Sequence, residues 1–400
     1  MRFSEIAGET GIFVDGDWIE KKDQDAKGAV RLIQLADVGP GEFRDKSDRH
    51  ITVEKADELH CTFLRKGDIL IARLGDPLCK ACVFPLDGLY ITAVDVAILR
   101  IGSDVVNPKY LIYLLNSPWF KDQVKQYESG TTRKRISRKN LDRIEMIFPP
   151  LPEQERIVAR IEELFSQLDA RVETLKKTKA QLSVYRQAAI TEAFSVENNT
   201  PNVCLSDIAQ IIGGITKGRD LSGTETIELP YLRVANVQNG YLDLSEIKTI
   251  KLRVDEKERY LLKPGDVLYT EGGDRDKLGR GTVWRGEIKD CVHQNHVFKA
   301  RVDQSKAIPE YVAFWSMSTP ARNYFYQKGK QSVNLASINK TVLAALTLPL
   351  PALEKQREII NHIESRLSVC DSIEQTVDTA LQQAEAMRQS ILTQAFGGAL

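Results

Sequence analysis

The stretch QERIVARIEELFSQLDARVETLKKTKAQLSVYRQAAITEAF, residues Gln154–Phe194, recurs in altered form as Gln356–Phe396. The two stretches align without a gap at a constant offset of 202 residues, and 13 of their 41 positions are identical. A Pro-Leu-Pro tripeptide precedes each of them, at residues 150–152 and 349–351. An internal repeat on this scale predicts a chain built from two related halves.

Both stretches have the composition of long helices. Neither contains Gly or Pro, and prolines precede each start, where a helix tolerates them. At 1.5 Å per residue, such a helix is roughly 60 Å long. Apolar residues with a seven-residue step predict a coiled-coil seam between the two helices, whereas the alternative is two separate helices on their own domains. The seam residues are Ile161, Leu168, Leu175, Leu182 and Ala189, and Ile363, Cys370, Val377, Ala384 and Ile391. A companion series is Ile373, Ala380 and Met387 in the second copy but Arg171, Thr178 and Tyr185 in the first.

The segments before the two helices also correspond. Leu64–Leu70, LRKGDIL, matches Leu262–Leu268, LKPGDVL, and Pro108 matches Pro309. Short apolar runs between turn signals, with a helix after each of these prolines, predict α+β domains. We therefore expect two tandem α+β domains joined by two long helices that form an antiparallel, pseudo-twofold coiled coil. The predicted boundaries are 1–150 and 199–350 for the domains, and 151–198 and 351–400 for the helices.

The composition excludes several classes of protein. The 400 residues carry 55 basic and 55 acidic side chains, so the chain as a whole is not a strongly basic polyanion binder. No run of about 18 apolar residues predicts a membrane span, and the first residues lack the apolar core of a secretion signal. Six cysteines are too few for a disulfide scaffold. We therefore expect a cytoplasmic protein without a membrane partner.

Motifs that would carry catalysis are weak. Asn107–Tyr110, NPKY, superficially resembles a loop of amino-methyltransferases, but its copy has lost the asparagine, and a proline that opens a helix explains it better. Gly213–Gly218 lacks the Lys-Ser/Thr ending of a phosphate-binding loop. The EIK triplets at 246–248 and 287–289 resemble half of a nuclease metal site, although such triplets are common in charged chains.

The spacing of cysteines and histidines gives an equally weak metal signal. The CKAC of Cys79–Cys82 is one ligand pair that His60 and Cys61 would have to complete, since the usual second pair is missing. His293 and His296 have no third ligand nearby in sequence. We therefore expect no catalytic residue, no bound metal and no cofactor on this chain.

Positive charge is concentrated in loops. Residues 130–143, GTTRKRISRKNLDR, hold six basic side chains and one acidic one. A further basic cluster, Arg275, Lys277 and Arg280, lies in the Gly-rich stretch of residues 271–281, EGGDRDKLGRG, which also holds three acidic side chains. Lys and Arg neutralise phosphates, while Arg, Asn and Gln also pair with base edges. Because such clusters recur at matching places in two tandem domains, we favour DNA binding over merely solvated charge. The candidate DNA-binding residues are Arg44, Lys46, Arg49, Arg73, Arg133, Lys134, Arg135, Arg138, Arg219, Arg275, Lys277, Arg280, Lys330 and Asn334.

Identical residues near the end of each long helix form a second candidate site. They stand where no shared seam position requires identity, so we expect them to face outward and dock partner subunits. The alternative is that they hold the helix pair to the domains of this chain. The candidate docking residues are Arg186, Gln187, Thr191 and Phe194, with their copies Arg388, Gln389, Thr393 and Phe396.

The whole pattern resembles the specificity (S) subunit of type I restriction–modification systems. The resemblance covers essentially the entire chain. The stretches that match the family most specifically are PPLPEQERIVARIEEL at 149–164, the second copy from Leu350, MRQSILTQAF at 387–396, GDWIEKKDQD at 16–25, RLIQLADV at 31–38 and GDILIAR at 67–73. One departure is Glu271, which stands where the first copy has Arg73.

The resemblance implies two target recognition domains, each reading one half of a split asymmetric site in double-stranded DNA. It implies helices that set the spacing and dock two methyltransferase (M) subunits, with further recruitment of restriction (R) subunits. The chain itself would be non-catalytic, and S-adenosylmethionine, ATP and Mg²⁺ would bind the partners. Two other hypotheses remain: a coiled-coil adaptor that does not bind DNA, and a solitary metal-dependent endonuclease that uses Glu287 and Lys289.

Overall fold

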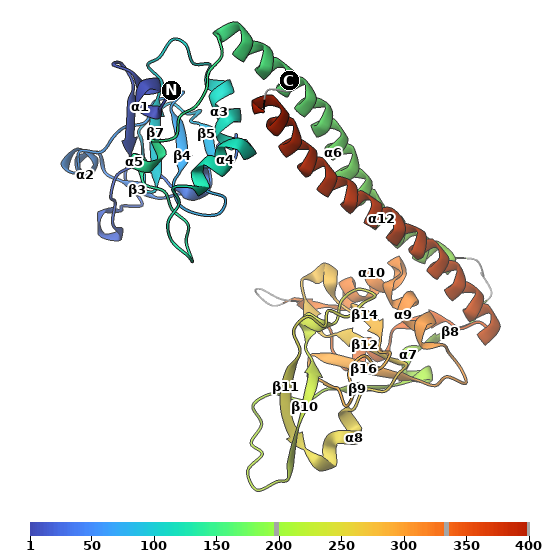
Figure 1. The fold of residues 1–400 in the computed structure, drawn as a ribbon. Coiled ribbons are helices and arrows are strands. Elements are labelled where there is room, and N and C mark those ends of the chain that lie inside the picture. Colours follow the sequence, from blue (N-terminus) through green and yellow to red (C-terminus); the bar gives the residue numbers. More distant parts are fainter. Residues whose placement is uncertain (196–199, 332–335, 398–400) are drawn as a thin grey trace. The chain divides into compact units, whose positions relative to one another are not determined.

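The protein divides into two compact units. The computed structural model describes residues 1–195, 200–331 and 336–397. The first unit holds Met1–Leu175 together with Thr379–Leu400, and the second holds Lys176–Asp378 (Figure 1). Each unit therefore combines one globular domain with a part of each long helix.

The first domain has two small sheets and several short helices. Its elements are α1 (Phe3–Ala7), β1 (Ile12–Asp15), β2 (Val30–Ile33), β3 (His50–Ile51), α2 (Val53–Glu58), β4 (Ile69–Ala72), β5 (Ala81–Val83), β6 (Tyr90–Thr92), β7 (Val96–Arg100), α3 (Pro108–Asn116), α4 (Pro118–Lys125) and α5 (Arg138–Leu141). An antiparallel sheet has the order β1-β7-β4-β5, and a mixed sheet has the order β3-β2-β6. Helix α3 packs against β5, and the buried apolar side chains of both form one core.

The second domain repeats this arrangement. Its elements are β8 (Asn202–Cys204), α7 (Leu205–Ile208), β9 (Ala209–Gly213), β10 (Thr226–Leu232), β11 (Lys248–Arg253), α8 (Lys257–Tyr260), β12 (Asp266–Thr270), β13 (Gly272–Gly273), β14 (Gly281–Val283), β15 (Val292–His293), β16 (Val297–Val302), α9 (Pro309–Met317), α10 (Thr319–Lys328), β17 (Lys330–Gln331), β18 (Ala336–Ser337), α11 (Lys340–Ala344) and β19 (Thr347–Pro349). The sheet β9-β16-β12-β14 corresponds strand by strand to β1-β7-β4-β5, and β11-β10-β15 corresponds to β3-β2-β6. The predicted α+β class of both domains is confirmed.

One buried ion pair marks the shared framework. Arg100 donates two hydrogen bonds to the carboxylate of Asp68, at 2.8 and 2.7 Å, and Arg301 does the same to Asp266 at the same two distances. Both aspartates are buried. Each pair joins the start of one central strand to the end of its neighbour, which fixes the register of the sheet.

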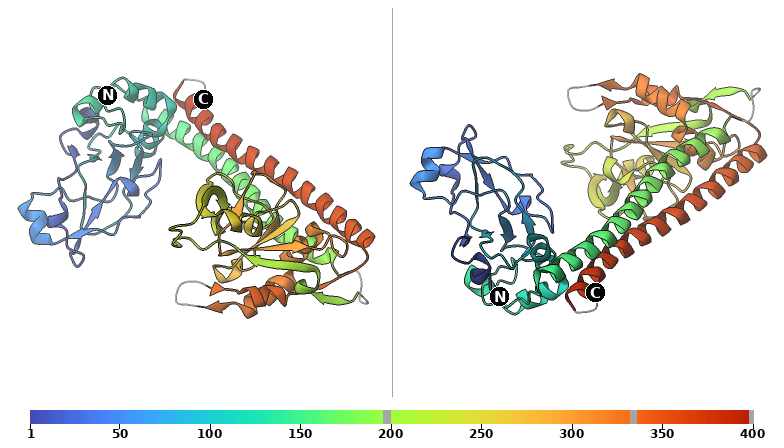
Figure 2. Two further views of the ribbon diagram at one scale, coloured as in Figure 1. Left: turned by 90° about the horizontal axis from the view of Figure 1, so that it is seen from below. Right: turned by 90° about the horizontal axis from the view of Figure 1, so that it is seen from above.

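The two long helices pair antiparallel within each unit. Helix α6 is Leu151–Ala193 and helix α12 is Leu353–Phe396. In the first unit Arg388 forms an ion pair with Asp169, and in the second unit Arg186 forms the equivalent pair with Asp371 at 2.6 Å. The same two repeat positions are therefore used twice, with the helices exchanged. Figure 2 shows the two helices, α6 and α12, side by side. This pairing confirms the coiled coil and excludes two separate surface helices.

The helix pair has one apolar seam. Most of the predicted seam side chains are buried, whereas Ile373, Met387 and Tyr185 of the companion series are 40%, 51% and 50% exposed. Ion pairs such as Lys179–Asp378, at 2.6 Å, also join the two helices. Among the described residues, no helix is long and apolar enough to cross a lipid bilayer.

A buried glutamine fastens each long helix to its own domain. The amide oxygen of Gln154 accepts a hydrogen bond from the backbone N–H of Asn107 at 2.9 Å, and its Nε2 donates to the carbonyls of Val105 and Pro149, both at 2.8 Å. Gln356 makes the same three kinds of bond in the second unit. Both glutamines are fully buried, so each helix starts from a fixed point on its domain.

Candidate nucleic-acid interface

The basic stretch after residue 128 folds into a tight hairpin, Ser129–Arg135. Two backbone hydrogen bonds of 2.9 Å join Ser129 and Arg135. Gly130 has a φ of +92°, and a Cβ there would lie 2.3 Å from the carbonyl oxygen of Arg133, so only glycine allows this turn. The side chain of Arg133 is exposed at the tip, without an ion-pair partner among the residues that the structure describes.

The arginines below this tip are engaged within the protein. Arg73 is 7% exposed, lies 2.9 Å from the carboxylate of Asp15, and donates to the carbonyls of Ile136 and Val94. Arg138 lies 3.3 Å from the same carboxylate. Arg73 therefore supports the hairpin from inside, although the sequence suggested a surface contact.

The remaining two cations of the hairpin lie beside carboxylates. Arg135 is 3.6 Å from Asp95, and Lys134 is 3.1 Å from Glu128. Exposed ion pairs of this kind are weak, so both cations can exchange their carboxylate for a phosphate at little cost.

A second exposed pair of cations, Lys46 and Arg49, lies on a loop that Asp37 holds. The carboxylate of Asp37 accepts backbone hydrogen bonds from Lys46 and Ser47, at 2.6 and 2.7 Å. Burial alone would raise the pKa of Asp37, but hydrogen bonds from Ser47 and neighbouring backbone groups outweigh it and lower the pKa. Arg44 of this loop instead pairs with Glu42 at 2.9 Å.

In the second domain, a cation stacks on an exposed ring. The guanidinium of Arg275 lies 4.3 Å from the ring centroid of Tyr326, which is 48% exposed. Such a pair presents a flat cationic surface to solvent. Lys277 pairs with Asp274 beside it.

The other DNA-binding candidates of the second domain differ in whether their side chains are bonded within the chain or exposed. Arg280 donates to the side-chain oxygen of Gln238 at 3.0 Å, and Arg219 makes two bonds of 2.9 Å to Glu256. Lys330 is exposed at β17. Asn334 lies outside the described residues.

The two domains differ most at one equivalent edge. Where the first domain places Arg73 and Asp95, the second places Glu271 and His296, whose Oε2 and Nδ1 are 2.6 Å apart. This edge therefore holds an arginine and an aspartate in the first domain, but a glutamate and a histidine in the second.

The four docking candidates of the second unit all contact the chain itself. Arg186 joins the ion pairs of the helices, and Phe194 packs edge-on against the ring of Tyr311. Gln187 and Thr191 form hydrogen bonds to helices α9 and α10. These contacts attach the end of α6 to the second domain, and they match the alternative in which the repeated residues hold the helix pair to the domains of this chain.

The first unit differs at two of the four positions. Arg388 again joins an ion pair, and Phe396 packs edge-on against Tyr110. The side chain of Gln389 has no hydrogen bond to the described part of the chain, and the hydroxyl of Thr393 bonds only back to its own helix. Docking therefore stays a prediction, and Gln389 and Thr393 are the two candidate residues whose side chains are available to a partner.

The weak catalytic motifs have local structural explanations. Asn107 caps helix α3 by accepting hydrogen bonds from two backbone N–H groups. Glu287 accepts a bond from the backbone of Arg285, within one turn. Cys79 and Cys82 are buried, and burial raises the pKa of each thiol to about 12. Within 1–195, 200–331 and 336–397, no three His, Cys, Asp or Glu side chains are grouped to hold a metal ion.

Sequence reasoning did not identify the buried glutamines or the carboxylate–arginine framework. Gln154 and Gln356 are identical in the two copies, and this identity outside the seam was the available signal. Asp68 and Asp266 lie in the matching GD dipeptides of the two halves, but their arginine partners lie more than 30 residues away.

Residues 11–183 and 198–383 match the family described as the type I restriction modification DNA specificity domain. The chain belongs to this family. Each match covers one domain and most of its helix, so the specificity domain occurs twice, as the sequence repeat and the paired frameworks indicate.

Individual members of the specificity-domain family are distant relatives. The chain is 26% identical over 313 residues to the type I restriction enzyme StySPI specificity subunit of Salmonella potsdam, covering 74% of this chain and 66% of that protein. It is 25% identical over 309 residues to the EcoKI specificity subunit of Escherichia coli strain K12, covering 73% and 65%. The match therefore spans about two thirds of the length of these relatives.

Solved structures share the fold. A chain from a structural study of complex assembly and conformational transition of the type I R-M system superposes with a TM-score of 0.70 at 18% identity, covering 100% of this chain and 97% of that one. The HsdS subunit from Thermoanaerobacter tengcongensis superposes with a TM-score of 0.51 at 17% identity, covering 100% and 96%. The specificity-domain fold is therefore shared over the whole chain.

Proposed function

We propose that this protein is the DNA sequence-recognition subunit of a type I restriction–modification complex. Each domain reads one half of a split asymmetric site, and the helix pair sets the distance between the halves. The observation that carries the proposal is the duplicated specificity domain, in which each copy bears its own basic loops on a common framework.

The two domains offer different side chains to DNA, which supports the reading of two different half-sites. The first domain offers Arg133 at a hairpin tip, and a guanidinium pairs best with the two acceptors of guanine. The second domain offers the carboxylate of Glu271 at the edge where the first has Arg73, and a carboxylate accepts from the amino group of cytosine. Two domains with such different edges are expected to prefer different base sequences.

The proposed partners are two methyltransferase subunits and restriction subunits, and the proposed ligand is double-stranded DNA. We propose that the chain is not itself an enzyme, and that S-adenosylmethionine, ATP and Mg²⁺ act on the partners. A cytoplasmic location agrees with the six cysteines, which are all free thiols. The family assignment favours this role over an adaptor without DNA or a solitary endonuclease.

The proposal is tested by co-expressing the chain with candidate methyltransferase subunits and mapping methylated adenines across the host genome. Methyltransferase subunits expressed alone are the control. A single split, asymmetric motif that needs this chain would support the proposal. A stable complex that leaves the genome unmethylated would contradict it and favour an adaptor.

A further inference from the structure

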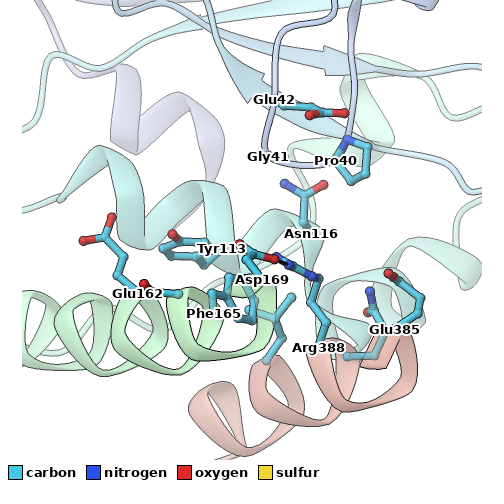
Figure 3. A pocket seen from close by; sticks show the side chains of 13 residues that line it. Pro40, Gly41, Glu42, Tyr113, Asn116, Glu162, Phe165, Asp169, Glu385 and Arg388 are labelled. Carbon is cyan, nitrogen blue, oxygen red and sulfur yellow. Dashed lines mark hydrogen bonds and ion pairs between the residues drawn. The ribbon is translucent and has the colours of Figure 1, made fainter. Parts of the chain in front are cut away.

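A cavity of about 820 Å³ lies within the first unit, between the loop of residues 40–42, helix α3 and the α6–α12 pair (Figure 3). Tyr113, Phe165 and Leu392 give it an apolar lining. Four carboxylates also line it, whereas Arg388, its one arginine, is neutralised by Asp169 and stacked 4.4 Å from the ring of Phe165. The carboxylates are Glu42, Glu162, Asp169 and Glu385.

The second unit fills the equivalent space with its own side chain. Met317 stands at the repeat position of Asn116, and a Cβ on Gly240 would lie only 3.0 Å from its Cε. In the first unit Asn116 instead turns to β5, where its Nδ2 donates to the carbonyl of Ala81 at 2.9 Å. Nothing lies within 4 Å of where a Cβ on Gly41, the copy of Gly240, would stand.

The second unit also satisfies its repeat glutamine. The Nε2 of Gln187 donates to the carbonyl of Met317 at 2.7 Å, and its Oε1 accepts from the guanidinium of Arg322 at 2.9 Å. In the first unit Lys121 stands at the position of Arg322 and turns inward to the carbonyls of residues 78 and 79, at 2.9 and 2.6 Å. Gln389, the copy of Gln187, is left exposed at the cavity.

The neighbouring threonine follows the same pattern. The hydroxyl of Thr191 accepts from the backbone N–H of Thr319 at 3.1 Å and lies 3.0 Å from its hydroxyl. The copy of Thr319 is Pro118, which has neither group, so Thr393 has no equivalent partner. The contacts of the second unit thus show which groups the repeated residues bind: an apolar, unbranched side chain next to a guanidinium.

We propose that the cavity of the first unit is a docking site for a segment of a partner protein that supplies this chemistry in trans. An arginine of the partner would bind Gln389 among the carboxylates, and a methionine or leucine would fill the space above Gly41. The inference rests on the proposed function, which makes the partner a methyltransferase subunit. Because the second unit fills its own copy of the site, only one of the two methyltransferase subunits would use the cavity.

Two variants of different chemistry test the docking. Asn116→Met would fill the cavity as Met317 fills its copy, and Glu385→Arg would reverse an exposed charge at its rim without touching the core. Ser183→Arg is the matched control, because Ser183 is the exposed repeat copy of Glu385. The full-length chain is titrated with purified methyltransferase subunit, and the stoichiometry is read by native mass spectrometry.

Both cavity variants are expected to weaken one of two binding events on the order of tenfold, so that complexes with a single methyltransferase subunit accumulate, while the control binds two. Unchanged binding of both subunits by Asn116→Met and Glu385→Arg would overturn the docking while leaving the proposed function intact. If the unmodified chain bound no methyltransferase subunit at all, the proposed function would fail, and the docking with it.

Discussion

At the scale of single residues, the surroundings of a cation decide its role. Around the hairpin Ser129–Arg135, Arg73 is buried on Asp15, and Arg135 rests against Asp95. Arg133 projects from the tip, and the glycine turn before it leaves no room for any other residue at position 130. The geometry of the hairpin, not the residue type, thus separates the exposed Arg133 from the arginines that are paired within the protein.

We expect Arg133→Ala to weaken DNA binding and to lower the salt slope of log K by about 1, because one phosphate or base contact is lost. A lost base contact would add about 1–3 kcal/mol and relax the sequence preference at one position. Binding is measured by fluorescence anisotropy against salt concentration. The control is Lys125→Ala, whose ammonium already pairs with Asp122 at 2.8 Å. An Arg133→Ala protein with the affinity and slope of the unmodified chain would remove Arg133 from the interface.

The sequence predicted the basic loop but not the roles within it. Asp15 and Asp95, which engage the neighbouring arginines, lie far from the loop in sequence and reach it only through the β1–β7–β4 sheet. A run of charged residues in the sequence therefore predicts an exposed surface. The residues that folding brings next to this run determine which of its side chains remain unpaired.

A buried histidine makes the second domain sensitive to acid. Burial lowers the pKa of His293 to about 4, and its Nδ1 lies 2.6 Å from the carbonyl oxygen of Val297, so it is held neutral. The unfolded side chain has a pKa of about 6.5, so the unfolded state binds more protons as the pH falls below that value. We expect the second domain to lose about 3 kcal/mol of stability between pH 6.5 and 4.

His293→Thr, which introduces the residue Thr92 of the first copy, should flatten this pH dependence in chemical unfolding. His362→Gln, at an exposed histidine, is the control. Equal pH slopes for His293→Thr and the unmodified chain would show that His293 does not cause the sensitivity.

At the scale of secondary-structure elements, the long helices combine a seam, ion pairs and a fixed start. The seven-residue step predicted their pairing, because an apolar stripe on a helix of this length needs a partner surface. It did not predict that Ile373 and Met387 of the companion series are exposed, since both look as apolar in sequence as the seam residues. The exchanged Arg186–Asp371 and Arg388–Asp169 pairs, identical in both copies, specify the antiparallel register instead.

The buried glutamine at each helix start leads to a prediction for this element. Gln154→Ala leaves one backbone N–H and two carbonyls without partners, and each buried unpaired group costs about 1–3 kcal/mol. We expect about 3 kcal/mol lower stability of the first unit and faster hydrogen exchange in the first turn of α6. Gln167→Ala, an exposed glutamine on the same helix, should change neither. If the two variants behave alike, Gln154 is not an anchor.

At the scale of the whole molecule, duplication separates what is common from what is specific. Both domains keep the same strand order and the same carboxylate–arginine pair, while Glu271 of the second domain stands where the first has Arg73. The repeat made the plan of two domains and two long helices predictable from sequence, because 13 identical positions in 41 define the two helices as equivalent; it did not predict the carboxylate–arginine pairs. The differences between the copies at Asn116 and Met317 were visible in sequence too, but only the structure shows that one leaves a cavity and the other fills it.

The central claim is that each domain reads its own half of a split DNA site, and an exchange of domains tests it most directly. Residues 1–150 are replaced by the corresponding domain of another family member, the chimera is co-expressed with the methyltransferase subunits, and methylated adenines are mapped. The account predicts a motif in which one half changes while the other half and the spacing stay as in the unmodified chain; replacement of residues 199–350 should change the opposite half. A motif altered in both halves, or in neither, would contradict recognition by two independent domains.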